Sequence, residues 1–274
     1  KGSYNSLNSF TGDNLDICFE DITQGWLLNY ESWLRAKGNK ETTISIQFRT
    51  LRSVYNKAIK RKCVGKEYYP FEDFHINKFN VHTDKRAISK NDVLKIISAD
   101  LTGKSEYVKF SRDIFVFSYL CGGINFCDVA SLTKENILNG RLSYVRQKTG
   151  KQINLCLTKN ASAIIDKYYK GGKGFLFPIL DITRHITATQ KENRLHKVLG
   201  QVDKSLKIVA QIAKVDVNLT TYVARHSYAT VLKRSGVPTS IICESLGHSS
   251  ERMTQIYLDS FENEQIDEAM KNLL

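Results

Sequence analysis

The residues best suited to chemistry lie near the carboxyl end of the chain, where a tyrosine follows a group of basic residues. Arg225 stands in ARHSYAT, His248 in LGHSS and Tyr257 in TQIYLDSF. A phenol hydroxyl can attack a phosphodiester and hold one end of the cleaved strand covalently. Arginine suits phosphate because its planar guanidinium binds two oxygens and stays protonated. This pattern predicts that Tyr257 is a nucleophile acting on a phosphodiester beside a basic cluster.

Three short predicted helices must bring these residues together, because the residues are distributed over three elements. Tyr222 and Arg225 are three apart on the first helix, so their side chains lie on one face. His248 follows the second helix, and Tyr257 lies in the third. Short connections allow the three elements to converge on one point. The helices are predicted near 221–235, 238–246 and 251–259.

The composition indicates which partners the chain meets. Its 274 residues suffice for one large or two ordinary domains, and its formal net charge is +12. A basic balance of this size favours a partner that carries phosphates, although solubility alone is the simpler explanation. We find no P-loop and no metal-ligand spacing, so neither a nucleotide nor a metal is expected as a cofactor.

The six cysteines are scattered, without a C-x-x-C pair. This distribution predicts reduced thiols in a cytosolic protein rather than a disulfide framework or a zinc site. No apolar run is long enough to span a bilayer, and nothing at the start resembles an export signal. We therefore expect a cytoplasmic protein with no membrane partner, and leave open an N-terminal domain before Lys1.

Residues 1–85 are predicted to form a small helical domain. A helix capped by Thr42 or Thr43 carries an apolar stripe that includes Phe48 and Tyr55. Between Glu41 and Glu67 there is no acid, whereas seven residues are lysine or arginine. A solvated helix face usually mixes signs, so we favour phosphate contacts here over simple solvation. The residues predicted to bind DNA are Arg49, Arg52, Lys57, Lys60, Arg61 and Lys62.

Residues 86–274 are predicted to form a second, mainly α-helical domain after a polar, basic linker. Ser89 is expected to cap its first helix. The segment GRLSYVRQKTGKQINLCL alternates around a Thr-Gly turn, which predicts a small β-hairpin. At the end, residues 262–274 predict a short helix that needs a groove to dock in. Its apolar face holds Ile266, Met270 and Leu273.

These motifs together resemble one family. Residues 89–262 resemble the catalytic domain of the tyrosine site-specific recombinases, the phage-integrase family, and residues 1–85 are similar to its helical core-binding domain. The segment LTTYVARHSYATVLKRSGVPTSIICESLGHSSERMTQIYLDSF is similar to integrases of mobile elements such as conjugative transposons. The resemblance implies a two-domain clamp that binds double-stranded DNA, cleaving and rejoining strands through a 3′-phosphotyrosine without metal or ATP. It also implies a homotetramer on DNA, docked through the C-terminal helix, and DNA-bending accessory proteins as further partners. A cytoplasmic protein of this family is expected at the bacterial nucleoid.

The resemblance assigns roles to individual residues. Tyr257 would attack the scissile phosphate, and Arg225 would grip the non-bridging oxygens. His248 would donate a further hydrogen bond to those oxygens. Lys148, in RQKTGKQ, matches the lysine that protonates the departing 5′-oxygen.

The chain departs from the family pattern at two positions. Aligning CGGINFCDVASL with the family's G-x-R-x-x-E places Asn125 at a catalytic arginine and Asp128 at the acid. Arg146 lies two residues before Lys148 on the predicted strand, so both side chains should project from one face, and we hypothesise that Arg146 replaces the missing guanidinium. Tyr222 stands at a histidine position, where a phenol can donate a hydrogen bond but cannot exchange protons near neutral pH.

Two other functions remain open at this point. A type IB topoisomerase-like enzyme would use the same chemistry to relax DNA as a monomer. A catalytically impaired DNA-binding protein of the same fold would explain Asn125, although the joint presence of the other catalytic side chains argues against it.

Overall fold

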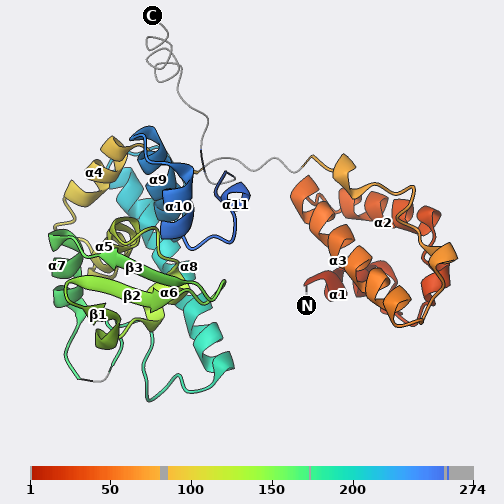
Figure 1. The fold of residues 1–274 in the computed structure, drawn as a ribbon, viewed down its shortest axis with the longest axis horizontal. Helices are drawn as coiled ribbons and strands as arrows, with labels where there is room; N and C mark the ends of the chain where they lie inside the picture. The colour runs from red at the N-terminus through yellow and green to blue at the C-terminus, as the bar shows by residue number, and fades with distance from the viewer. Residues whose placement is uncertain (1, 81–85, 173, 256–257, 259–274) are drawn as a thin grey trace, which may run out of the picture. The chain divides into compact units, whose positions relative to one another are not determined.

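The computed structural model describes residues 2–80, 86–172, 174–255 and 258. Tyr257 and the predicted docking helix at 262–274 lie outside the described residues. The chain divides into two compact units, Lys1–Asp84 and Lys85–Leu274, coloured red to orange and yellow to blue in Figure 1. Within the described residues, no helix has the length and apolar character needed to cross a membrane.

The first unit is helical, with an aromatic core. Its helices are α1 (Gly2–Phe10), α2 (Gln24–Ala36) and α3 (Glu41–Lys60). The predicted apolar stripe of α3 is confirmed, because Phe48 and Tyr55 are fully buried. Phe48 packs between the rings of Tyr30 and Phe74, with ring centroids 5.5 and 4.7 Å away. The predicted threonine cap of α3 is wrong: the helix already begins at Glu41, whose negative charge favours a helix N-terminus.

The second unit is mainly helical, with one small sheet (Figure 1). Its helices are α4 (Lys90–Ser98), α5 (Glu106–Leu120), α6 (Phe126–Ser131), α7 (Lys159–Tyr168), α8 (Ala188–Ile212), α9 (Thr221–Arg234), α10 (Thr239–Ser245) and α11 (Glu251–Gln255). The strands are β1 (Ile137–Leu138), β2 (Arg141–Val145) and β3 (Gln152–Cys156). They pair antiparallel in chain order, so the predicted hairpin is confirmed as β2–β3 and gains a third strand.

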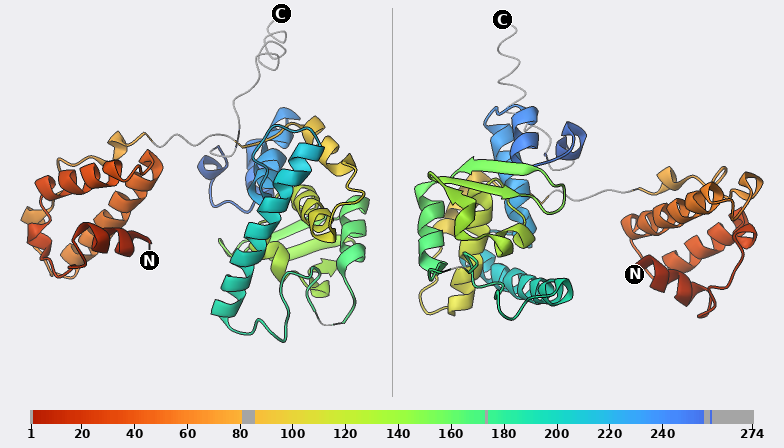
Figure 2. Two further views of the ribbon diagram at one scale, coloured as in Figure 1. Left: turned by 180° about the vertical axis from the view of Figure 1, so that it is seen from behind. Right: turned by 60° about the horizontal axis from the view of Figure 1, so that its bottom comes forward.

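Helix α5 forms the centre of the second unit and packs against both α8 and α9 (Figure 2). Ser89 caps α4 as predicted, accepting a hydrogen bond from the backbone N–H of Asp92 at 3.1 Å. A smaller apolar cluster joins α9 and α10 to the residue that follows Tyr257. Its buried members are Ala229, Ile242, Leu246 and Leu258. This cluster packs α10 against α9.

A glycine turn between α5 and α6 lies directly against α9. Gly123 has a φ of +64°, a region that L-residues with a side chain rarely adopt. A Cβ atom placed there would lie 2.7 Å from the Cα atom of Arg225. The glycine therefore permits both the turn and the close approach of α9.

We expect Gly123→Ala to destabilise the protein more than Gly103→Ala, its matched control. Gly103 also has a positive φ, +73°, but nothing lies within 4 Å of its added Cβ. Gly103→Ala should cost about 1–2 kcal/mol in strain alone, and Gly123→Ala about 1–3 kcal/mol more, because backbone must move. Urea unfolding of both variants measures the difference, and equal costs would show that the close approach is not constrained.

Candidate active site

Three consecutive backbone carbonyl groups organise the site. They belong to residues 246–248, which directly follow α10. Arg225 Nη2 donates to the first at 2.5 Å, Arg146 Nη1 donates to the second at 2.8 Å, and Lys151 Nζ donates to the third. The carboxyl end of a helix carries partial negative charge, so cations are favoured there. We call this arrangement the carbonyl row.

Arg225 is the most deeply placed of these cations. It projects from α9 and is 2% exposed. Its Nη1 donates to the carbonyl oxygen of Gly123 at 2.8 Å, and its Nη2 lies 3.0 Å from Nε2 of His248. The guanidinium therefore projects from α9 and is fixed by hydrogen bonds to the glycine turn and to the carbonyl row. Such a group is fixed before any anion arrives, which lowers the reorganisation that binding requires.

His248 is an almost fully buried imidazole, 4% exposed, among cations. Burial, the largest cause, and the nearby charges of Arg225, Arg146, Lys148 and Lys151 together lower the pKa of His248 to about 4. The ring is consequently neutral at physiological pH. Its Nδ1 lies 2.9 Å from the hydroxyl oxygen of Thr254, which is fully buried on α11.

The turn after β2 carries Lys148 and is held by α6. The side chain of Asp128 on α6 accepts a hydrogen bond from the backbone N–H of Gln147 at 3.0 Å. The amide of Gln147 donates in turn to the hydroxyl of Ser131 at 2.8 Å. Burial raises the pKa of Asp128, whereas the charges of Arg146 and Arg225 act to lower it. Lys148 itself is exposed.

The predicted geometry of Arg146 and Lys148 is wrong. Strand β2 ends at Val145, so the alternation of side chains along a strand does not apply to either residue. Arg146 turns inward and is 3% exposed, whereas Lys148 is exposed in the turn. The inward turn nevertheless brings Arg146 to the carbonyl row, beside the groups that hold Arg225.

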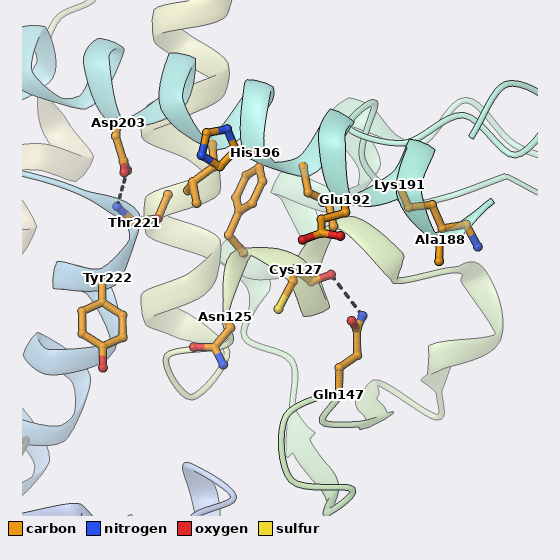
Figure 3. A pocket seen from close by; sticks show the side chains of 13 residues that line it. Asn125, Cys127, Gln147, Ala188, Lys191, Glu192, His196, Asp203, Thr221 and Tyr222 are labelled. Carbon is orange, nitrogen blue, oxygen red and sulfur yellow. Dashed lines mark hydrogen bonds between the residues drawn. The ribbon is translucent and has the colours of Figure 1, made fainter. Parts of the chain in front are cut away.

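Asn125 and Tyr222, the two departures from the family pattern, both line a neighbouring pocket. The pocket has a volume of about 690 Å³. Figure 3 shows Asn125, Tyr222 and Gln147 along one side and residues of α8 along the other. Tyr222 is 41% exposed and packs edge-on against the ring of His226, with centroids 4.7 Å apart. Tyr222 thus lines this pocket from the first turn of α9.

The basic residues predicted on the first unit are all exposed. Arg49 and Arg52 line a hollow of about 440 Å³ and take part in a second of about 380 Å³. Lys57 and Lys60 also line the second hollow. Arg61 and Lys62 follow the end of α3 and are exposed too. The structure thus collects Arg49, Arg52, Lys57 and Lys60 along one side of α3.

The structure brings Arg225, His248 and Arg146 together and places Lys148 at their edge. The sequence did not identify Lys151 or Thr254 as parts of the site. No sequence motif marks either residue, because each is a single polar residue. Lys151 contacts His248 across 97 residues of the chain, and Thr254 contacts it across six. Within the described residues, no group of histidine, cysteine and acidic side chains could hold a metal ion.

Comparison with known proteins identifies the family to which the sequence is similar. Residues 86–264 match the phage integrase family, and residues 1–80 match the phage integrase SAM-like domain. The chain is 24% identical over 248 residues to tyrosine recombinase XerD of Halalkalibacterium halodurans, covering 86% of this chain and 77% of that protein. It is 21% identical over 257 residues to the integrase of Escherichia phage P2, covering 94% of this chain and 67% of that one.

Two solved structures share the fold. A lambda integrase fragment, crystallised as a dimer bound to a COC′ core site, superposes with a TM-score of 0.68 at 16% identity, covering 95% of this chain and 90% of that one. The Tn1549 transposon integrase, in complex with a circular intermediate DNA, gives a TM-score of 0.65 at 16% identity, covering 99% of this chain and 92% of that one.

The lowered pKa of His248 predicts how stability depends on pH. The folded protein holds this ring neutral down to about pH 4, whereas the unfolded chain protonates it near the ordinary value of 6.5. Between these values the unfolded state binds more protons, so the free energy of unfolding falls as the pH is lowered from 6.5 towards 4. One proton corresponds to a slope of at most about 1.4 kcal/mol per pH unit.

Urea unfolding across this pH range should show a shallower slope in His248→Gln than in the parent. The matched control is His75→Gln, at an exposed histidine of the first unit, which should keep the slope of the parent. Equal slopes in His248→Gln and the parent would contradict a neutral, buried His248.

Proposed function

The chain belongs to the phage integrase family, and from this premise we propose the reaction that its site performs. The chain is a tyrosine recombinase, an enzyme that cleaves and rejoins DNA strands. The observation that carries the residue assignments is the carbonyl row, which holds buried Arg225 and Arg146 beside neutral His248. We propose that the scissile phosphate binds against these three side chains.

In the proposed reaction, Tyr257 attacks the phosphorus atom and the 5′-oxygen of the next nucleotide departs. The tyrosine becomes a 3′-phosphotyrosine, and attack by a 5′-hydroxyl reverses the step and releases Tyr257. Negative charge builds on the phosphate oxygens during both steps, so fixed cations stabilise the transition state. Arg225 supplies a positive charge, and two backbone carbonyl groups fix its position.

Lys148 is proposed as the acid that protonates the departing 5′-oxygen. Its exposure and its place on a turn suit a group that must meet the DNA strand. The hydrogen bond from the turn to Asp128 limits how far the turn can move. Proton donation needs hydrogen-bond reach first and a suitable pKa second, and the turn provides the reach.

Arg146 is proposed to replace the arginine that Asn125 does not supply. Its guanidinium donates to the carbonyl group next to the one that holds Arg225. Its Nε–H is buried and has no hydrogen-bond partner within the described residues. A buried donor of this kind costs free energy until it meets an acceptor, and a phosphate oxygen would be one.

Duplex DNA is the proposed substrate, contacted by both units. The exposed cations along α3 would bind backbone phosphates through Arg49, Arg52, Lys57, Lys60, Arg61 and Lys62. Strand exchange between two sites needs four cleavages, so we propose a homotetramer on DNA, docked through residues 262–274. The similar lambda integrase has been crystallised as a tetramer bound to a Holliday junction. DNA-bending accessory proteins remain a proposal from the family resemblance.

One observation favours a second candidate, a protein that binds DNA without cleaving it. Asn125 stands where a cation is expected, and loss of one such donor costs roughly 100 to 1,000-fold in rate. Nothing in the described residues favours the topoisomerase-like alternative over the recombinase. A direct assay for the covalent intermediate separates the recombinase from the binding protein.

Tyr257→Phe should abolish the covalent intermediate, whereas Tyr222→Phe should retain it. The substrate is a labelled duplex with the protein's own exchange site and a nick beside the cleavage position, so that the released fragment diffuses away. A protein–DNA adduct on a denaturing gel reports cleavage. An adduct in Tyr257→Phe, or none in the parent despite normal DNA binding, would overturn the assignment.

Arg146→Ala should slow adduct formation by roughly 100 to 1,000-fold, because it removes a cation from the phosphate site. The matched control is Arg141→Ala on β2, whose exposed side chain donates to Asn154 instead. Single-turnover rates on the nicked duplex measure both. If Arg146→Ala and Arg141→Ala cleave equally fast, Arg146 does not replace the missing arginine.

A further inference from the structure

The two ring nitrogens of His248 have partners with different chemistry. Nε2 lies 3.0 Å from a guanidinium nitrogen of Arg225, and Nδ1 lies 2.9 Å from the hydroxyl oxygen of Thr254. A guanidinium can only donate, so Nε2 must accept and carries no proton. The single proton of the neutral ring is therefore on Nδ1, and Thr254 accepts it.

This arrangement is the reverse of the one that the proposed reaction needs. To donate to a phosphate oxygen, His248 must carry a proton on Nε2. A second proton would add a positive charge beside Arg225, Arg146, Lys148 and Lys151, whose charges already disfavour the imidazolium. Moving the proton from Nδ1 to Nε2 leaves the ring neutral. In the net exchange with solvent, the ring gains one proton at Nε2 and loses one from Nδ1.

The change of tautomer makes a demand on the partner of Nδ1. Before the change that partner must accept a hydrogen bond, and afterwards it must donate one. A hydroxyl group can do both, because it has one donor and two acceptor sites and its hydrogen rotates. A carbonyl or a carboxylate in the same place would support only the first state.

We propose that Thr254 is a positioning residue whose hydroxyl supports both tautomers of His248. In the DNA-free protein it accepts from Nδ1–H while Arg225 donates to Nε2. When the phosphate binds Arg225, the hydroxyl rotates and donates to Nδ1, and Nε2–H donates to the phosphate. The second state rests on the proposed function, whereas the first follows from the DNA-free geometry.

The position of Thr254 in the chain links this switch to the nucleophile. Thr254 is fully buried on α11 and precedes Tyr257 by three residues. Leu258, directly after Tyr257, is 2% exposed in the apolar cluster that includes Leu246. Thr254 and Leu258, which flank Tyr257 in the chain, are thus both held in place. The hydrogen bond to His248 holds Thr254, and the apolar cluster holds Leu258.

The test compares Thr254→Val, which keeps the shape and removes the hydroxyl, with Thr254→Ser, which keeps the hydroxyl. Proteins labelled with ¹⁵N-histidine are made in the Tyr257→Phe background, so that DNA binds without being cleaved. The His248 signal is identified by its absence in His248→Gln. The ¹⁵N chemical shifts of its two ring nitrogens show which nitrogen carries the proton.

Without DNA, we expect a protonated Nδ1 and an unprotonated Nε2 in the Thr254 and Thr254→Ser proteins. Bound to the exchange-site duplex, both should show the proton on Nε2. Without DNA, Thr254→Val should keep an unprotonated Nε2, because Arg225 still donates to it. In the complex, Thr254→Val lacks the hydroxyl that donates to Nδ1 and should show a mixture of tautomers. A proton fully on Nε2 in the Thr254→Val complex, or protons on both nitrogens in the parent complex, would overturn the proposal.

A second readout uses the tyrosine-containing proteins and the nicked duplex. Thr254→Val should form the adduct on the order of tenfold more slowly, because the acceptor Nδ1 is left buried and unpaired in the DNA-bound state, and Thr254→Ser should restore the rate. An equal rate in Thr254→Val would contradict the positioning role. Absence of adduct in every protein, together with the expected DNA-free ¹⁵N pattern, would reject the proposed reaction but support the DNA-free tautomer.

Discussion

The site depends on the carbonyl row at residues 246–248, where three successive peptide groups bind three cations from α9 and from the β2–β3 turn. These partners are dipoles rather than carboxylates, so they orient the cations without cancelling their charge. Paired carboxylates would have made the cluster nearly neutral and a poor site for a phosphate. Asp128, a buried acid whose pKa responds to Arg146 and Arg225, holds the turn. A net positive site thus remains after every cation has been fixed in place.

Much of the fold was predictable because the residues that begin and end its elements act locally. Gly236 adopts a φ of +80° and ends α9 near the predicted residue, and Pro238 precedes α10 as expected. The apolar stripe of α3 and the Thr-Gly turn of the hairpin also depend on neighbouring residues only. The start of α3 was mispredicted because threonine was expected to provide a cap that the helix does not use.

The detailed site was less predictable because its contacts span the chain. Arg146 meets a carbonyl group 101 residues away, and Arg225 meets that of Gly123 at a separation of 102 residues. The motifs indicated Arg225 and His248 but not what holds them. The error over Arg146 arose from extending strand alternation beyond Val145, where β2 ends. The tautomer of His248 could be assigned only once both of its ring partners were known.

The most direct test of the account asks whether Arg225 acts on the negative charge of the scissile phosphate. Single-turnover adduct formation is measured for the parent and Arg225→Ala on two nicked duplexes, one with a normal phosphate and one with a neutral methylphosphonate at the cleavage position. The account predicts a loss of roughly 100 to 1,000-fold in Arg225→Ala on the phosphate and a much smaller loss on the methylphosphonate. An equal loss on both substrates would contradict it, because Arg225 would then support structure rather than bind charge.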